Sequence, residues 1–481
     1  MKFDLAIVGN GILGLSTALN IISKDSRIKI AIIGPVSKEG SATMASGAML
    51  NYIGEVTSHT LKNPFSRTKL EISIKAAKLW KGWLEKINHD LDEKEQVNIV
   101  PGTYVILNSK SGYMETENYD AMIAAAKEYG EPFSEVCPSA VPGINPLDDC
   151  RPLRSLFLPD EGSIDSGSLL AAIHKNLSNN SNITFLDAKV REAITDENKV
   201  SGVILDDGKK IYAEKVLLAA GSYNQDIINS IPELAKRIPP ILAGLGISAL
   251  VSQNSNLPIK HVIRTANRSG ACGLHVTARS DKVLYVGATN NIVATPSTKQ
   301  KLGLSQFLLR CAVDQIDQDL YNSEVISWSI GNRPVSLDTF PLVGKTSIDN
   351  LFILTGTYRD GLQQSPFWAE YMSEIILNDN SIIEHPFMPE RDLICVMKDK
   401  EASINEVVRH YMAGMYEHDM RLARLFSEKS FEDLLKLKFE KIYDKLGTDF
   451  PFVPDILFLF ELSEDTDGCI EFIKQYFDRS K

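Results

Sequence analysis

The sequence lacks both a long apolar run and an excess of basic residues. A membrane-spanning helix needs about 18 or more consecutive apolar residues, and no such run occurs in the 481 residues. The chain carries 51 Lys and Arg against 62 Asp and Glu, a net charge of −11 at pH 7. A negative field disfavours binding to phosphate backbones and anionic lipid. We therefore expect no membrane span and no nucleic-acid partner.

Cysteine is scarce, and its spacing excludes the usual metal and disulfide patterns. Six cysteines are scattered along the chain without a CxxC pair: Cys137, Cys150, Cys272, Cys311, Cys395 and Cys469. This suits free thiols in a reducing compartment, so we expect a cytoplasmic protein. A competing interpretation takes the apolar stretch 5–22 as a secretory signal, but Asp4 and the glycines within the stretch interrupt it. No metal site is expected, because His410 and His418 are two helical turns apart and no HExxH motif occurs.

The remaining composition is that of a globular protein of two or three domains, with 44% hydrophobic and 23% charged residues. Apolar runs at 4–8 and 28–33 predict strands, and the spacing in 13–23 predicts a helix between them, which together make a βαβ unit. A long amphipathic helix is expected over 63–87. Short strand-like runs in 97–108 and 238–293 predict a separate sheet. Runs at 163–177 and 215–221 again have the α/β pattern of the βαβ unit. The α/β domain and the domain of the separate sheet are therefore expected to interleave along the chain.

A glycine motif lies between the first predicted strand and helix. Gly9, Gly11 and Gly14 form GxGxxG, a pattern in which glycines permit a tight turn, a close approach to a pyrophosphate and helix packing. The motif predicts dinucleotide binding at the helix N-terminus. An acidic residue that binds the ribose usually ends the second strand, but Gly34 occupies that place. Asp25 and Glu39 are poorly placed to replace the ribose-binding acid. We therefore expect backbone groups, or Ser37 and Lys38, to bind the adenosine part of the cofactor.

Four further segments give the chain a family resemblance. They are a run of small residues at 41–50, a strand ending in small residues at 215–222, the segment 331–344 containing Arg333-Pro334, and the segment 351–361, which leads into a helix near Ser365. In order and spacing they resemble the D-amino-acid oxidase superfamily of FAD-dependent oxidoreductases, most closely its glycine oxidase branch. The resemblance covers about residues 1–385. It implies an α/β fold, with a Rossmann-type FAD-binding domain interleaved with an antiparallel-sheet substrate domain.

The expected domain boundaries follow from the resemblance and the strand pattern. The FAD-binding domain is expected in parts 1–88, 151–230 and 329–385, and the substrate domain in parts 89–150 and 231–328. Residues 390–481 carry 14 basic and 20 acidic side chains, which is 14 − 20 = −6. They form the expected acidic helical C-terminal module, with helical spacing at 405–416 and a helix start at Ser430. A helical hairpin packed on the body is favoured over a partner-binding helix.

The resemblance also implies the site residues. Arg333 is implied to bind the substrate carboxylate and Arg359 to lie near the flavin, and His275 stands where the family has an active-site tyrosine. A guanidinium can bind a carboxylate through two parallel hydrogen bonds, whereas the alternative for each arginine is an ordinary salt bridge. His275 could hydrogen-bond substrate and change charge near neutral pH, or be a buried strand histidine, and its presence argues against glycine as substrate. The expected cofactor contacts are Gly9, Gly11, Ile12, Leu13, Gly14, Thr43, Ala45, Ser46, Gly47, Ala48, Met49, Val190, Ala220, Gly221, Arg333, Tyr358, Arg359, Asp360, Gly361 and Leu362.

The resemblance implies oxidation of the C–N bond of an amino acid or N-alkylamino acid. FAD is expected to be noncovalent, since no cysteine lies beside Arg333. Hydride transfer to flavin N5 would give an imine that hydrolyses, with oxygen or another acceptor taking the electrons. One alternative is a 2-hydroxy acid dehydrogenase with His275 as general base. Another is a flavin-binding scaffold with vestigial chemistry, for which Gly34 and His275 are the motivation. A homo-oligomer or a partner contact through the C-terminal module is also considered.

Overall fold

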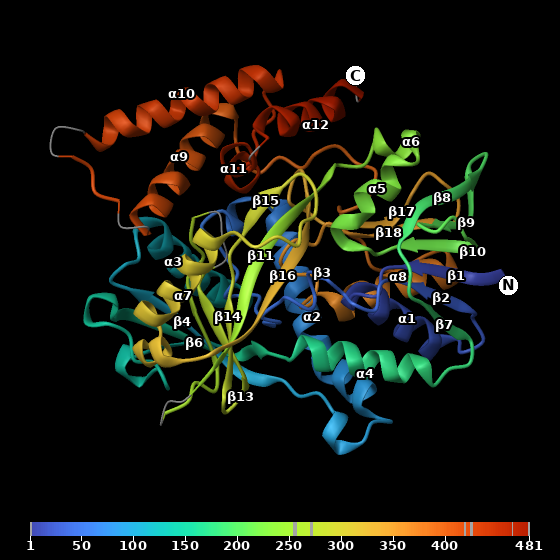
Figure 1. Ribbon diagram of the computed structural model, residues 1–481, viewed down its shortest axis with the longest axis horizontal. Coiled ribbons are helices and arrows are strands. Elements are labelled where there is room, and N and C mark those ends of the chain that lie inside the picture. The colour runs from blue at the N-terminus through green and yellow to red at the C-terminus, as the bar shows by residue number, and fades with distance from the viewer. Residues whose placement is uncertain are drawn as a thin grey trace.

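The computed structural model describes residues 2–253, 257–269, 273–417, 420–423, 427–463 and 465–479. His418 and Cys272 lie outside the described residues. Two β-sheets stand side by side, and a group of helices from the C-terminal end of the chain lies over one of them (Figure 1). None of the described helices is both long enough and apolar enough to cross a bilayer.

The first sheet has the strand order β17-β18-β10-β1-β2-β7, with β9 and β8 following on from β10. Strands β18, β10, β1, β2 and β7 are parallel to one another. The strands are β1 (Lys2–Val8), β2 (Ile30–Ile33), β7 (Ile183–Leu186), β8 (Val190–Asp196), β9 (Lys199–Leu205), β10 (Lys210–Leu218), β17 (Leu342–Lys345) and β18 (Leu351–Thr355). This confirms the predicted βαβ unit and the return of the chain to the first sheet.

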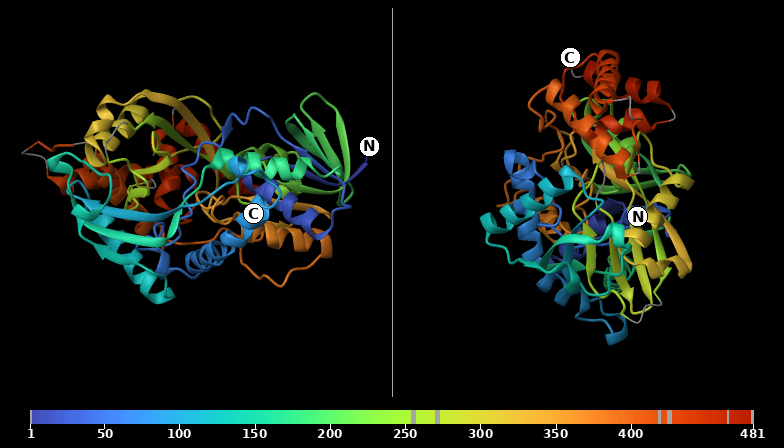
Figure 2. Two further views of the ribbon diagram at one scale, coloured as in Figure 1. Left: turned by 90° about the horizontal axis from the view of Figure 1, so that it is seen from below. Right: turned by 90° about the vertical axis from the view of Figure 1, so that its left-hand side faces the viewer.

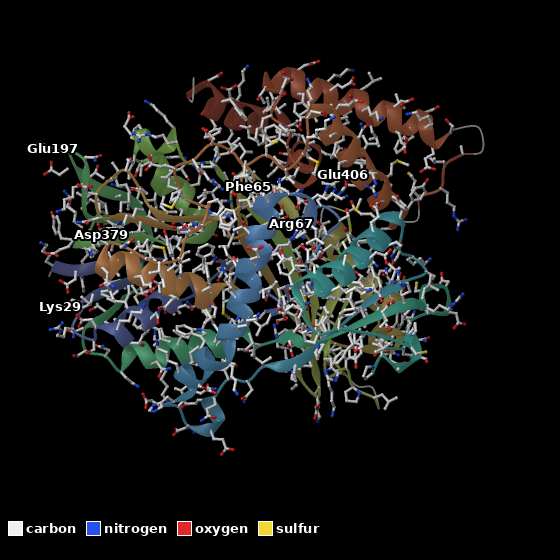
Figure 3. The ribbon with its side chains drawn as sticks, turned by 180° about the vertical axis from the view of Figure 1, so that it is seen from behind. Lys29, Phe65, Arg67, Glu197, Asp379 and Glu406 are labelled. Atoms are coloured by element: carbon white, nitrogen blue, oxygen red, sulfur yellow. The ribbon has the colours of Figure 1, made fainter. Side chains whose placement is uncertain are left out.

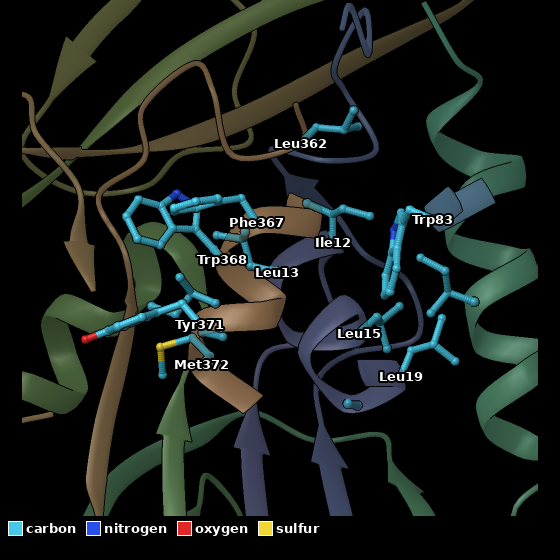
Figure 4. Close-up of a cluster of buried hydrophobic side chains, with 14 of the residues drawn as sticks. Ile12, Leu13, Leu15, Leu19, Trp83, Leu362, Phe367, Trp368, Tyr371 and Met372 are labelled. Carbon is cyan, nitrogen blue, oxygen red and sulfur yellow. The ribbon is translucent and has the colours of Figure 1, made fainter. Parts of the chain in front are cut away.

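Helices cover both faces of this sheet, because successive side chains of a strand point to opposite faces. Leu5 and Ile7 of β1 pack in one core with helices α1 (Ile12–Lys24), α2 (Pro64–Asn88), α4 (Ser166–Ser178) and α8 (Ser365–Asn378). Figure 4 shows α1 and α8 in contact within this core, with Trp83 of α2 beside them. Ala6 and Val8 pack in the opposite core with α5 (Asn224–Asn229) and α6 (Pro232–Ala235). The long helix expected over 63–87 is confirmed as α2, and the Asn63 side chain caps it.

The second sheet is mainly antiparallel and has the order β3-β16-β11-β14-β13-β12-β4-β6-β5, with β15 beside β11. Its strands are β3 (Gly40–Ser41), β4 (Val100–Asn108), β5 (Ser134–Val136), β6 (Pro152–Ser163), β11 (Ile241–Ser252), β12 (Val262–Thr265), β13 (His275–Ser280), β14 (Val283–Gly287), β15 (Asn291–Val293) and β16 (Val325–Ser336). Helices α3 (Tyr113–Tyr129) and α7 (Leu302–Gln315) pack against it. The interleaving of two sheets along the chain is therefore observed.

Two expected boundaries need correction. Strand β6 falls in the part 151–230 that we assigned to the FAD-binding domain, but it pairs along its length with β4 in the second sheet. Strand β16 runs past the expected boundary at 328, because its pairing with β11 continues to Ser336. Which sheet a strand joins depends on its distant partner and not on its own residues, and this is why the sequence misplaced them.

The C-terminal module consists of α9 (Lys400–Glu417), α10 (Glu428–Leu446), α11 (Pro454–Leu462) and α12 (Thr466–Arg479). Its core is continuous with the body, because Leu242, Val335 and Tyr358 pack in the same cluster as module residues such as Phe439. The right-hand view in Figure 2 shows these helices lying on top of the body. Helix α10 begins at Glu428 and is capped by the Ser427 hydroxyl, which accepts a hydrogen bond from the Ser430 amide at 3.1 Å. The expected start at Ser430 was therefore wrong, since a second serine upstream supplies the cap.

Candidate active site

A main cavity of about 430 Å³ opens at the carboxyl ends of β1, β2 and β10 and reaches β16 of the second sheet. Parallel α/β sheets bind ligands at this edge. The predicted cofactor residues that line it are Gly9, Gly11, Ile12, Leu13, Thr43, Ser46, Val190, Ala220, Gly221, Arg333, Tyr358, Arg359, Gly361 and Leu362.

The glycine turn is shaped for an anion. Gly9 has φ +120°, and a Cβ there would lie 2.2 Å from the Ala219 carbonyl oxygen, so only glycine fits. Helix α1 begins after Gly11 with no acidic residue in its first turn and no side-chain cap. Its amides and partial positive charge can therefore receive a pyrophosphate. Gly14 does not line the cavity; a Cβ there would lie 2.1 Å from the Gly9 carbonyl oxygen, so its role is packing of the helix against the turn.

The place of the usual ribose-binding acid is filled by an asparagine side chain. A Cβ on Gly34 would lie 2.6 Å from Asn10 Cγ, and Asn10 Nδ2 donates to the Pro35 carbonyl oxygen at 3.1 Å. Lys38 Nζ donates to the Asn10 carbonyl oxygen at 2.7 Å, and burial lowers the pKa of Lys38 to about 8. Lys38 lines the main cavity, as does Glu39, although Glu39 follows the second strand at a distance where no ribose contact was expected. Ser37 is not among the lining residues.

An inner cavity of about 80 Å³ adjoins the main cavity and shares Ser46, Arg333 and Leu362 with it. The remaining predicted cofactor residues lie here: Ala45, Gly47, Ala48, Met49 and Asp360. His275 from β13 also lines the inner cavity. All predicted site residues except Gly14 therefore converge on two connected cavities.

Arg333 extends from β16 between the two cavities. Its Nη1 donates to the Thr289 carbonyl oxygen at 3.1 Å, and a Cβ on Gly246 would lie 2.4 Å from that nitrogen. Glycine at 246 is thus required for the guanidinium to pack where it does. In the described part of the chain no carboxylate forms an ion pair with Arg333. Its charge is available to an anionic ligand.

Arg359 differs from Arg333 because it already has an acidic partner. Arg359 Nη2 lies 3.4 Å from Asp455 Oδ2 of α11, and the guanidinium stacks 4.7 Å from the centre of the Tyr358 ring. The Tyr358 hydroxyl donates to the same Asp455 oxygen at 2.7 Å and accepts from Asn290 Nδ2 at 2.5 Å. Burial raises the pKa of Tyr358, so it stays protonated. Arg359 therefore forms a salt bridge with the C-terminal module and also lines the main cavity, where the expected contact with FAD stays a prediction.

His275 is a neutral hydrogen-bonding group. Its Nδ1 lies 3.0 Å from the Gly273 carbonyl oxygen, which can only accept, so Nδ1 carries the proton and Nε2 is an acceptor. A Cβ on Gly47 would lie 2.9 Å from Nε2. Burial lowers the pKa of His275 to about 4. The expectation that this side chain changes charge near neutral pH was wrong, because the ring is withdrawn from water.

The sequence from β1 into α8 matches a known family. Residues 4–375 match the family described as FAD dependent oxidoreductase (DAO). The chain belongs to this family. It is an FAD-dependent oxidoreductase, and the glycine turn before α1 has the uncapped amides that the pyrophosphate of FAD needs.

Individual relatives of this oxidoreductase are distant. A glycine oxidase of Pseudomonas aeruginosa is 21% identical over 402 residues, which cover 81% of this chain and 99% of that protein. A bifunctional protein ThiO/ThiG of Synechocystis sp. is 21% identical over 397 residues, 81% of this chain. The match covers 54% of ThiO/ThiG, so the chain spans about half the length of that relative. The crystal structure of glycine oxidase from Geobacillus kaustophilus has a TM-score of 0.67 at 19% identity, covering 82% of this chain and all of that one. This likeness shows the fold.

The oxidoreductase also has a buried charge cluster beside the inner cavity that the sequence did not reveal. Arg264 of β12 is fully buried; its Nη1 bonds Glu55, and its Nη2 donates to Asn267 Oδ1 at 2.6 Å. Burial alone would raise the pKa of Glu55, but the charges of Arg264 and Arg359 hold it below its usual range. Glu161 accepts from the Tyr52 and Gly54 amides at 2.8 and 2.9 Å, yet burial raises its pKa to about 7. No local motif marks these residues, because they come from distant parts of the chain.

Proposed function

We propose that this oxidoreductase oxidises the C–N bond of an amino acid or N-alkylamino acid. The main support is the position of Arg333, which lines both the main cavity and the inner cavity and has no carboxylate partner among the described residues. A planar guanidinium in that place can bind a substrate carboxylate through two charge-assisted hydrogen bonds. The carboxylate then fixes which face of the α-carbon meets the cofactor.

FAD, held by the glycine turn and the lining of the main cavity, would supply the two-electron redox chemistry, with oxygen or another compound as the final electron acceptor. Arg333 holds the carboxylate, and His275 Nε2 offers a neutral acceptor to the amine N–H. The lone pair of a deprotonated amine assists loss of the hydride, so no catalytic base is needed. The resulting protonated imine adds water to give an oxo acid and an ammonium or alkylammonium ion.

The two alternatives lose support. A 2-hydroxy acid must lose its hydroxyl proton, and a histidine whose pKa burial lowers to about 4 is a weak base for that step. The scaffold alternative was motivated by Gly34 and His275. Asn10 fills the space beside Gly34, and His275 lines the inner cavity. Both differences from the family pattern are therefore compatible with an active enzyme.

Cofactor attachment and cell compartment are part of the proposal. Of the five described cysteines, all free, none lines the main or inner cavity, which supports noncovalent FAD. Free thiols also favour the cytoplasm. A homo-oligomer, or a partner contact through the C-terminal module, stays a prediction.

The test is anaerobic reduction of the purified full-length holoenzyme. Amino acids, N-alkylamino acids and 2-hydroxy acids are added separately, and loss of the oxidised flavin absorbance is followed. Bleaching by amino or N-alkylamino acids supports the proposal. Bleaching by 2-hydroxy acids alone overturns it, as does failure of the protein to bind FAD.

A further inference from the structure

The inner cavity continues into a larger outer cavity of about 250 Å³. The two share Glu55, Arg359 and Asp360, so these three side chains form the border between them. Glycine would be held within the inner cavity by Arg333. Only a larger amino acid could gain contacts in the outer cavity.

Part of the outer cavity's wall belongs to the C-terminal module. The module and the segment leading to it contribute Val396, Met397, Glu406, His410, Val453, Pro454 and Asp455. The opposite wall includes His59, whose Nε2 lies 3.0 Å from Glu406 Oε1 of α9. Figure 3 labels Glu406 on α9, and Phe65 and Arg67 on α2 of the body. The module is therefore joined to the body across the outer cavity.

Asp455 connects the module to the border. It lies in the first turn of α11, where a carboxylate is favoured by the helix dipole, and its side chain is 19% exposed. One of its oxygens accepts from both the Tyr358 hydroxyl at 2.7 Å and Arg359 Nη2 at 3.4 Å. Tyr358 has φ +51°, an unusual conformation for a bulky residue, which its neighbours must hold in place. Asp455 thus fixes two adjacent residues that line the main and outer cavities.

Each acidic side chain of the outer cavity has a basic partner. Glu55 pairs with Arg264, Asp360 with Lys69 at 2.7 Å, and Glu406 with His59. Asp455 pairs with Arg359. The basic Arg268 lies 3.9 Å from Glu115 and 4.0 Å from Glu417. Charge compensation of this kind leaves little attraction for a second carboxylate or ammonium. The apolar lining side chains are Val56, Leu70, Met114, Phe340, Val396, Met397 and Val453.

We propose that the C-terminal module forms the outer wall of the substrate site and that Asp455 is a positioning residue for Tyr358 and Arg359. The site then takes an amino acid with a neutral, partly apolar side chain or N-substituent in preference to glycine. This inference rests on the proposed amino-acid oxidation and names its substrate class.

The first test compares substrates and fills the outer cavity. Full-length holoenzyme is reduced anaerobically with glycine, N-alkylglycines and neutral or acidic amino acids of increasing size. The wild type is expected to bind the neutral, larger substrates at least about ten-fold more tightly than glycine, a difference of the size of one buried side-chain contact. Met397→Trp, which narrows the outer cavity, is expected to remove that preference, so that the larger substrates bind no more tightly than glycine.

The second test separates positioning from overall folding. Asp455→Asn is expected to raise KM for the larger substrates about ten-fold, with a smaller change in kcat, because a charge-assisted hydrogen bond is weakened. Acetate has a carboxylate for Arg333 but no side chain to enter the outer cavity, so its Kd, read from the flavin spectrum, is expected to stay the same. The matched control is Asp467→Asn, in the first turn of α12 with its side chain 84% exposed.

The outcomes distinguish this inference from the proposed function. If glycine is the best substrate, or if Asp455→Asn and Met397→Trp both match the Asp467→Asn control, the inference is overturned while amino-acid oxidation stands. If the acetate Kd changes as much as KM, Asp455 acts on the whole fold and the positioning role is wrong. If no amino acid reduces the flavin, both fail.

Discussion

Arg333 and Arg359 carry the same side chain but have different partners, and this decides their roles. Arg359 is compensated by Asp455, whereas Arg333 donates to backbone carbonyls and keeps its charge for a ligand. Arg333→Ala should weaken carboxylate substrates by about 2–5 kcal/mol, the usual effect of removing one partner of a buried charge pair. Steady-state kcat/KM of the holoenzyme measures this. Arg237→Ala, at a half-exposed salt bridge with Glu390, is the control. Unchanged kinetics for Arg333→Ala would remove this residue from the site.

His275 should contribute to acid sensitivity and not to the pH dependence of catalysis near neutrality. Its folded-state pKa of about 4 lies below the usual 6.5, so the unfolded chain binds more protons between these values. Its contribution to stability therefore falls as pH drops from about 6.5 to 4. His275→Phe should lose less thermal stability than wild type between about pH 7 and pH 5. His385, whose pKa burial also lowers to about 4, is present in both proteins. Equal loss of Tm in the two proteins would contradict the assignment.

The turn between β1 and α1 is the element on which cofactor binding depends. Gly9→Ala places a Cβ 2.2 Å from the Ala219 carbonyl oxygen at φ +120°, so the turn must distort. FAD affinity should fall about ten-fold or more, measured by flavin content after purification and by titration of the apoprotein. Gly82→Ala is the control, because its Cβ would meet no described atom within 4 Å on helix α2. That variant should bind FAD normally and be more stable by about 0.5–1 kcal/mol. Full FAD binding by Gly9→Ala would refute the role of this turn.

Elements with local signals were predictable, and elements defined by distant pairing were not. The βαβ unit follows from the periodicity of residues 4–33, and α2 and α1 begin and end within one residue of their predicted limits. Strand β6 was not predicted and its residues were placed in the wrong domain, since its register with β4 joins residues about 50 positions apart, such as Val105 and Leu156. The charge state of His275 could not be predicted either, because it depends on burial by several strands.

At the scale of the whole molecule, the resemblance ended near residue 385 and left the C-terminal module unexplained. The structure joins it to the site through Asp455, 97 positions after Tyr358. No sequence pattern marks this contact, because an aspartate after a proline at a helix start is an ordinary local feature. Arg333 could be predicted from the family motif, whereas Glu55, Arg264 and Asp455 come together only through the tertiary fold.

The junction between module and body should make stability fall as pH rises. Glu417 at the end of α9 lies 4.0 Å from Arg268 Nε, which is 3.9 Å from Glu115 of α3. Burial, opposed by Arg268 and aided by Glu115, raises the pKa of Glu417 to about 7. The folded protein then binds more protons than the unfolded chain between about pH 4.5 and 7, so stability is lost as pH rises through this range.

Glu417→Gln retains a neutral side chain at every pH and should flatten this dependence. The Tm of wild type should fall more between about pH 5 and pH 8 than that of the variant. Glu161, whose pKa is also raised to about 7, likewise makes stability fall as pH rises. Because it is present in both proteins, the difference between them is due to Glu417. Asp449→Asn, whose side chain is 89% exposed, is the control and should match wild type. Equal slopes in Glu417→Gln and wild type would mean that the carboxyl is ionised at the junction, held by Arg268 more strongly than burial opposes it.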